Sequence, residues 1–150
     1  MAIQRAATAR PRHNPKEAAN VLHALNPSDP MEIIKAVRRG LPGSTIKSVA
    51  EEWQLSLSEL YPLLHLKART AQRLINSDRL DSDVSDRLVQ VIKLHNKCLD
   101  VFQDRNKVLQ WLKTPNYSLG DQTPLSLLDT SEGVELVHAV LIKIQYGIFA

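Results

Sequence analysis

Helix punctuation recurs along this chain, and it constrains the possible fold more than any other feature of the sequence. The pairs Asn14-Pro15 and Asp29-Pro30 each place an N-cap residue before a proline at the first helical position, with a glutamate at position N3. Ser56 and Glu59 have the spacing of a capping box. Apolar residues then recur every three to four positions, and strand-like alternation is almost absent. The sequence therefore predicts an all-α fold.

The predicted helices fall into two parts. Helices are expected to begin at the caps Asn14, Asp29, Ser44 and Ser56, with a short turn at Arg69-Thr70. The longest periodic run covers residues 83–102, and we expect further helices over 108–112, after Thr123-Pro124, and over 130–146, with a loop over 114–122. The predicted divisions are an arm and first helix (1–28), a helix-turn-helix region (29–77) and a C-terminal helical domain (78–150).

The segment TIKSVAEEWQLSLSELYPLL, residues 45–64, has the pattern of two short helices joined by a tight turn, the DNA-binding helix-turn-helix. Ala50 is small enough for the point where the helices cross. The core positions of the motif are filled by Val49, Leu55, Leu60 and Leu63. Gln54 stands where glycine is usual and requires a positive φ, and Pro62 removes a hydrogen bond from the second helix. The alternative is an ordinary helical hairpin.

The residues expected to contact DNA come from the second helix and from nearby cations. The exposed face of the second helix is predicted to present Ser56, Ser58 and Tyr61, and the cations placed to hold phosphates are Lys47, Lys67 and Arg69. Residues 1–70 hold 10 Lys and Arg against 6 Asp and Glu, whereas residues 71–150 hold 9 against 10. This uneven charge suggests two different partners.

No catalytic or metal-binding constellation is recognisable in the sequence. The aspartates from Asp78 to Asp86 lack the glycine and glutamate of a calcium loop and are better explained as helix caps. His95 and Cys98 have no second pair with which to complete a zinc site, and we expect both in the core. The glycines form no phosphate-binding loop. We therefore predict no enzyme activity, no metal and no cofactor.

The chain resembles a known family over most of residues 30–150. The pattern WLxxPNxxLGxxxPLxLLxTxxG begins at Trp111 and ends at Gly133, and RTAQRLINSDRLDSDVSDRL precedes it. These motifs are similar to those of the Xre/MbcA/ParS antitoxins and their C-terminal toxin-binding domain. At Asp121 many members have a second glycine, and we expect this departure to change only the stiffness of the turn.

The resemblance implies partners and a mechanism. Members of the family are paired with RES-domain toxins that consume NAD or attach ADP-ribose to proteins, and the antitoxin blocks the toxin's active site. Many also repress their own operon. We expect a homodimer that binds operator DNA and forms a larger complex with its toxin. The alternative is a free-standing helix-turn-helix regulator whose C-terminal half only dimerises.

Cysteine content and hydropathy indicate where the protein works. A single cysteine, Cys98, permits no internal disulfide framework, and no apolar run approaches the roughly 20 residues of a membrane span. Residues 1–12 lack the apolar block of a signal peptide and are expected to form a flexible arm. A cytoplasmic protein that does not enter a membrane is predicted.

The last residues of the sequence are apolar and carry no charge except the terminal carboxylate. Thr130 is predicted to cap a final helix, and Gly147 to end it in the left-handed conformation. The tail, which we define as Tyr146, Gly147, Ile148, Phe149 and Ala150, is the predicted toxin-binding segment. Its alternative is that Phe149 folds back onto the protein's own core.

Overall fold

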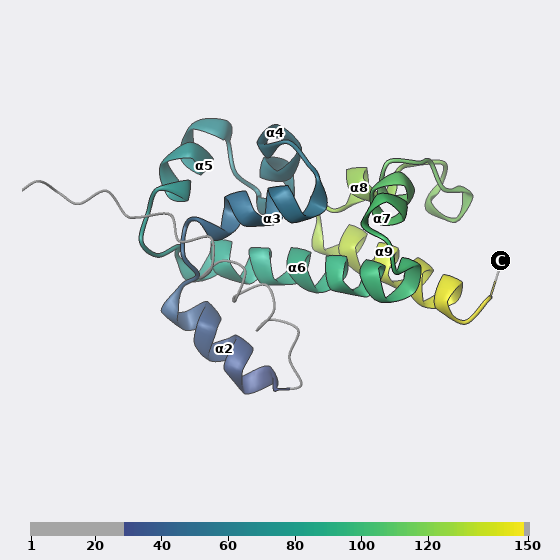
Figure 1. Cartoon of the computed structure of the whole chain (residues 1–150), viewed down its shortest axis with the longest axis horizontal. Helices are drawn as coiled ribbons and strands as arrows, with labels where there is room; N and C mark the ends of the chain where they lie inside the picture. Colours follow the sequence, from purple (N-terminus) through teal and green to yellow (C-terminus); the bar gives the residue numbers. More distant parts are fainter. Residues whose placement is uncertain (1–28, 149–150) are drawn as a thin grey trace, which may run out of the picture.

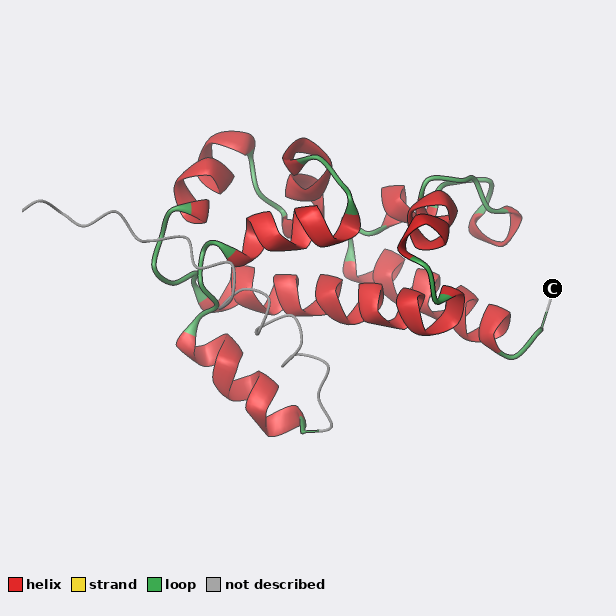
Figure 2. Ribbon diagram, in the orientation of Figure 1, coloured by secondary structure: helices red, strands yellow, loops and turns green. Residues whose placement is uncertain are grey.

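The computed structural model describes residues 29–148, and the predicted helix that begins at Asn14 lies outside them. Within these residues the chain forms helices and turns and no strand (Figure 2), so the predicted all-α class is confirmed. In chain order the elements are α2 (Pro30–Arg39), α3 (Thr45–Trp53), α4 (Leu57–Leu60), η1 (Tyr61–Leu64), α5 (Ala68–Ile75), α6 (Ser82–Phe102), α7 (Arg105–Leu112), η2 (Tyr117–Leu119), α8 (Pro124–Leu127) and α9 (Ser131–Gln145).

Helix α6 is the axis of the molecule (Figure 1). It has 21 residues and begins where the Asp81 carboxylate accepts a 2.8 Å hydrogen bond from the Val84 amide. Helices α2, α3 and η1 pack on its first part, and α7 and α9 pack on its remainder. We call α2–α5 with η1 the N-terminal half and α7–α9 with η2 the C-terminal half. One continuous hydrophobic core joins both halves through α6.

Side-chain caps fix the starts of several helices, as the sequence predicts, but Ser44 before α3 makes no such bond, so its prediction as a cap is wrong. Asp29 accepts from the Met31 amide at 2.9 Å, and Thr130 accepts from the Gly133 amide at 2.9 Å. Ser56 and Glu59 form the full capping box at the start of α4. Each cap satisfies amide groups that have no partner within the helix, so these starting points are set locally.

The region predicted as a turn at Arg69-Thr70 is helical, so that prediction is wrong. Helix α5 covers Ala68–Ile75, and its N-cap residue Lys67 makes no side-chain hydrogen bond. With no capping signal in the sequence, the helix depends on packing: Ala71 is fully buried, and Leu74 and Ile75 are partly buried against the core. Burial of one face stabilises a short helix that its own sequence would not hold.

Three smaller differences separate the structure from the predicted pattern. Helix α7 begins at Arg105, earlier than the predicted 108, because Asp104 caps the Asn106 and Lys107 amides. The predicted loop over 114–122 contains the short helix η2. Helix α2 has the apolar periodicity of a helix that packs on a core, but it buries none of its residues: α6 is its main partner, and Ile34 is 38% exposed.

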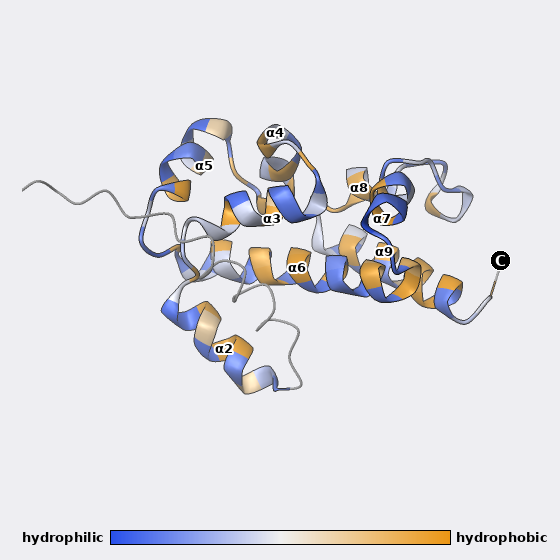
Figure 3. Cartoon of the chain, viewed as in Figure 1, coloured by the Kyte–Doolittle hydropathy of each residue, from blue (hydrophilic) through white to orange (hydrophobic). Residues whose placement is uncertain are grey.

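The hydropathy of the helices matches this arrangement. In Figure 3 hydrophobic residues occur along the whole of α6, on which the other helices pack, and α5 is mostly hydrophilic. Within the described residues no helix has the length and hydrophobicity needed to cross a membrane. His95 and Cys98 are both buried in the core, and no group of metal-ligating side chains is found in residues 29–148.

Candidate functional site

Helices α3 and α4 form the predicted two-helix corner in the N-terminal half. Ala50 is 3% exposed. The turn passes through Gln54 with φ 56°, the left-handed conformation that the sequence required there. The Leu55 amide donates to the Ala50 carbonyl at 2.9 Å, so the carbonyls at the end of α3 keep partners although no glycine is present.

Most of the predicted DNA-contacting residues lie on the surface, and one does not. Ser56 and Ser58 at the start of α4 and the cations Lys47, Lys67 and Arg69 are all exposed. Tyr61 is only 6% exposed, so its prediction as part of the exposed face is wrong. Pro62 ends α4 and the chain tightens into the 3₁₀ helix η1, whose three-residue repeat aligns Tyr61 with buried Leu64.

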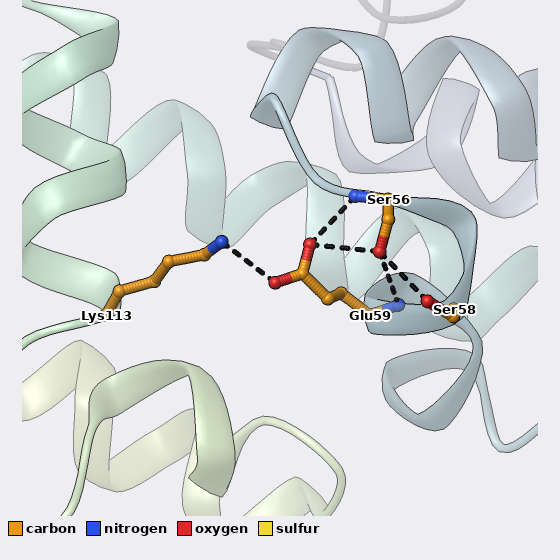
Figure 4. Close-up of polar contacts among 4 residues, drawn as sticks. All are labelled: Ser56, Ser58, Glu59 and Lys113. Carbon is orange, nitrogen blue, oxygen red and sulfur yellow. Dashed lines mark hydrogen bonds and ion pairs between the residues drawn. The ribbon is translucent and has the colours of Figure 1, made fainter.

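The capping box at the start of α4 also connects the two halves of the molecule. Figure 4 shows the Glu59 carboxylate between two partners: it accepts from the Ser56 amide at 2.8 Å and pairs with Lys113 Nζ at 2.8 Å. Lys113, followed by the Ser56 amide, lowers the pKa of Glu59 below its usual value. Ser56 is therefore occupied in capping, and Ser58 is the freer hydroxyl on this surface.

A buried arginine makes a second connection. Arg87 of α6 is 5% exposed; its Nε donates to the Leu63 carbonyl at 2.6 Å, and its Nη2 donates to the Leu128 carbonyl. Those carbonyls end η1 in the N-terminal half and α8 in the C-terminal half. Burial lowers the pKa of Arg87, and the nearby carboxylates of Asp129 and Asp86 oppose this shift. One guanidinium therefore satisfies buried carbonyls from both halves.

At the other end of the molecule, α9 ends as predicted. The Gly147 amide donates to the Ile144 carbonyl at 3.1 Å, and the Ile148 amide donates to the Lys143 carbonyl at 2.8 Å. Gly147 has φ 66°, so these bonds form a Schellman motif that turns the chain away from the helix axis. Tyr146 and Ile148 are 71% and 58% exposed. Phe149 and Ala150 lie outside the described residues.

Two family models match this chain, in the order of its two halves. The model described as the antitoxin Xre-like helix-turn-helix domain matches residues 32–93. The model described as the antitoxin Xre/MbcA/ParS C-terminal toxin-binding domain matches residues 99–147.

The chain belongs to the Xre/MbcA/ParS antitoxin family.

Three curated relatives are also named antitoxins, and the chain matches each of them over most of its length. The antitoxin is 27% identical over 137 residues to the Prs ADP-ribosylating antitoxin of Sphingobium sp. (strain YBL2), covering 85% of this chain and 86% of the relative. It is 25% identical over 114 residues to the antitoxin Xre of Photorhabdus laumondii, with 75% and 77% covered. It is 23% identical to the antitoxin Xre of Yersinia enterocolitica, with 79% and 81% covered. DNA and a toxin are the partners that its two domains imply.

The family motif of the antitoxin consists largely of residues that fold the domain. Leu119 and Leu128 are buried, and the Trp111 ring packs on Phe102 with 5.4 Å between ring centroids. At Gly133 a Cβ would lie 1.7 Å from the Leu127 carbonyl oxygen, so only glycine allows α9 to approach α8 this closely. These residues shape the toxin-binding domain from within, and its contacts must come from exposed side chains.

Two features of the antitoxin were not found by sequence reasoning. Arg87 has no local pattern that distinguishes it from the solvated charges around it on α6. Tyr117, which is 86% exposed, follows Pro115-Asn116 in the motif. Tyr117 is a large aromatic residue among residues that form turns, and this pattern could have predicted an exposed aromatic side chain.

Proposed function

We propose that this antitoxin inhibits a RES-type toxin, one that consumes NAD or transfers ADP-ribose, by placing its tail in the toxin's active site. The observation that carries this proposal is the end of α9, where Gly147 directs the chain away from the helix and leaves Tyr146 and Ile148 in solvent. The toxin-binding domain of the family extends to residue 147, and one relative is named an ADP-ribosylating antitoxin. The first fact supports a contact between the end of α9 and the toxin, and the second supports a toxin that uses NAD. The chain acts as an inhibitor and performs no catalysis.

The chemistry of the tail suits an NAD-binding cleft. Ligand-binding clefts of enzymes are lined mainly by apolar and aromatic side chains. Tyr146 and Ile148, which are exposed, would fill apolar space in such a cleft together with Phe149. The tail thereby competes with the substrate for the groups that bind it.

Deletion of residues 147–150 tests this mechanism. We expect the truncated antitoxin to lose toxin neutralisation by at least about 100-fold in affinity, with its melting temperature unchanged. Full neutralisation by the truncated chain would contradict the mechanism, and a lowered melting temperature would instead indicate that the tail packs on its own core.

We further propose that the helix-turn-helix represses the operon of the antitoxin. Lys47, Lys67 and Arg69 are exposed around the two-helix corner, and the exposed Ser58 hydroxyl, whose one partner among the described residues is the Ser56 hydroxyl at 3.0 Å, lies at the start of α4. Replacing Lys47 and Arg69 by alanine should weaken operator binding and reduce its salt dependence by about two units of slope, one for each lost phosphate contact. Toxin neutralisation should be unchanged.

The matched control removes two cations from the C-terminal half, Lys107→Ala with Lys143→Ala. It should leave the salt dependence of operator binding as it is, because Lys107 on α7 and Lys143 on α9 belong to the segment that matches the toxin-binding domain. If both double variants change the slope equally, overall charge determines binding and the proposed contacts are wrong.

We propose that the antitoxin works as a homodimer. Helix-turn-helix repressors read two half-sites about 34 Å apart, which requires two copies of the domain related by symmetry. Light scattering at micromolar concentration should give twice the mass of the chain, alone or with operator. A monomer under both conditions would contradict the proposal.

A further inference from the structure

Large apolar side chains on the surface are concentrated in the C-terminal half. Among the described residues they are Met31, Ile34, Tyr117, Leu136, Ile142, Tyr146 and Ile148. Five of these seven lie between residues 117 and 148, within or directly after the segment that matches the toxin-binding domain. Apolar side chains left in water near one another are typical of a surface that a partner covers. Tyr117 is the most exposed of them, at 86%.

The loop that carries Tyr117 is held rigidly by its own backbone. The Asn116 amide donates to the Gln122 carbonyl at 3.0 Å, which closes the loop at its base. The Asn116 carbonyl accepts from the Leu119 and Asp121 amides, both at 3.0 Å, and its side chain accepts from the Ser118 amide at 2.9 Å. Asn116 therefore makes most of the hydrogen bonds that organise the turn around Tyr117, and the Gly120 amide adds a bond to the Tyr117 carbonyl at 3.1 Å. A side chain on such a loop loses little conformational entropy when it binds.

The fold does not use the Tyr117 ring. Leu119, two residues later, is 4% exposed and attaches the loop to the core, and η2 packs against α9. The Tyr117 side chain points away from this contact into solvent. A tyrosine combines a large apolar ring with a polar hydroxyl group, and such residues often contribute most of the binding energy at protein interfaces. The exposure of Tyr117 therefore indicates a role in binding a partner and not in stabilising the fold.

The loop and the tail lie at the same end of the molecule. Figure 1 shows the segment between α7 and α8 and the end of α9 together at one end of the long axis, opposite α2 and α5. A protein that receives the tail would extend past this end and lie beside the loop. The occupant of this surface is thus the toxin itself, approaching from the C-terminal end of α9.

We propose that Tyr117 is a second contact with the toxin, made on the toxin surface outside the substrate cleft that the tail enters. This inference rests on the proposed function. The toxin would offer a shallow apolar recess with a hydrogen-bond partner for the phenol hydroxyl group. The two contacts have separate tasks: the tail blocks substrate, and Tyr117 increases the lifetime of the complex.

The test measures affinity and inhibition separately, with the toxin encoded beside the antitoxin gene purified as a catalytically inactive variant for the binding assay. Tyr117→Ser should weaken binding about 30-fold with an unchanged melting temperature, and Tyr117→Phe should fall between serine and wild type. The matched control is Met31→Ser, which removes a side chain that is 54% exposed in the N-terminal half. It should bind as wild type does.

Inhibition of the active toxin distinguishes the two contacts. At saturating concentration the Tyr117→Ser antitoxin should still inhibit completely, whereas the complex with the chain truncated after Tyr146 should retain activity. If Tyr117→Ser binds within twofold of wild type while the truncation loses inhibition, the second contact is wrong and the tail mechanism stands. If wild type fails to bind this toxin at all, the proposed function fails and the Tyr117 contact with it.

Discussion

The two halves of this antitoxin bury the same kind of core on α6 but present different surfaces. Around the two-helix corner the N-terminal half exposes hydroxyl groups and cations, among them Lys47, Ser58 and Arg69. The C-terminal half exposes large apolar side chains, above all Tyr117 and Tyr146. The difference predicts two modes of binding within one chain. Cationic contacts with phosphates weaken steeply with salt, whereas desolvation of apolar side chains is nearly independent of it.

Although their surfaces differ, the two halves are connected to each other by several contacts. Besides the shared core, Arg105 pairs with Glu52 at 2.7 Å and Lys113 with Glu59 at 2.8 Å, and His65 Nε2 is hydrogen-bonded to the Asp129 carbonyl. The first two are exposed ion pairs of small energetic value. Arg87 makes the buried polar connection, so we expect it to contribute more to the stability of the contact between the halves than either ion pair does.

The largest effect is expected for Arg87→Met, which breaks that connection. Loss of the guanidinium leaves the Leu63 and Leu128 carbonyls buried without their donor, and the free energy of unfolding should fall by about 3 to 4 kcal/mol. Urea unfolding can follow each half separately, since the only two tryptophans of the sequence are Trp53 on α3 and Trp111 on α7.

Single-tryptophan variants, Trp53→Phe and Trp111→Phe, provide these separate signals, and Lys93→Met is the control for a cation exposed on the same helix. Both signals should shift to lower urea together in Arg87→Met and stay in place in Lys93→Met. A shift in one signal alone would mean that the halves unfold independently and that the comparison describes two separate domains.

The second effect concerns pH and the contact of α6 with the N-terminal half. His95 of α6 stacks on Trp53 with ring centroids 4.8 Å apart, and burial, with a smaller contribution from Arg105, lowers the pKa of His95 from 6.5 to about 4. The folded protein thus favours neutral histidine. The contribution of neutral His95 to the free energy of unfolding is complete above pH 6.5. It is lost as the pH falls from 6.5 through 4, because only the unfolded chain takes up a proton on His95 in that range.

The expected loss from this group is up to about 3 kcal/mol between pH 7 and pH 4. His95→Phe keeps an aromatic ring beside Trp53 without a titrating group, and the difference between the two pH profiles of the unfolding free energy isolates the histidine. Parallel profiles for wild type and His95→Phe would contradict this prediction, because they would mean that the pKa of His95 is the same in the folded and unfolded protein.

The smallest effect is confined to the C-terminal half, in the loop of Tyr117. Gly120 and Asp121 both have positive φ, 66° and 61°, and a Cβ at Gly120 would meet no atom within 4 Å. Gly120→Ala should therefore cost about 1 kcal/mol through conformation alone, and Asp121→Gly should stabilise by about 0.5 kcal/mol. Thermal unfolding measures both. A larger loss in Gly120→Ala would show that the loop has contacts beyond its own turn.

Local signals account for the parts of the structure that were predicted from the sequence. The caps at Asp29, Ser56 and Thr130 act on amides within three residues, so their patterns predict helix starts wherever the helix later packs. The left-handed conformations at Gln54 and Gly147 follow from the same local geometry. The family motif could also be recognised in the sequence, because its glycine and leucine residues are needed for the packing of α8 and α9.

Long-range packing decided the rest. Helix α5 has no cap and forms because Ala71 is buried, and Tyr61 turns inward because Pro62 changes the helix type against the core. Arg87 binds carbonyls 24 and 41 residues away, so nothing near it in the sequence marks its role. The helix starts at Asp29, Ser56 and Thr130, the order of the two halves and the family are therefore predictable from local patterns of residues. Which side chains reach the surface is not, since burial depends on neighbours that are distant along the chain.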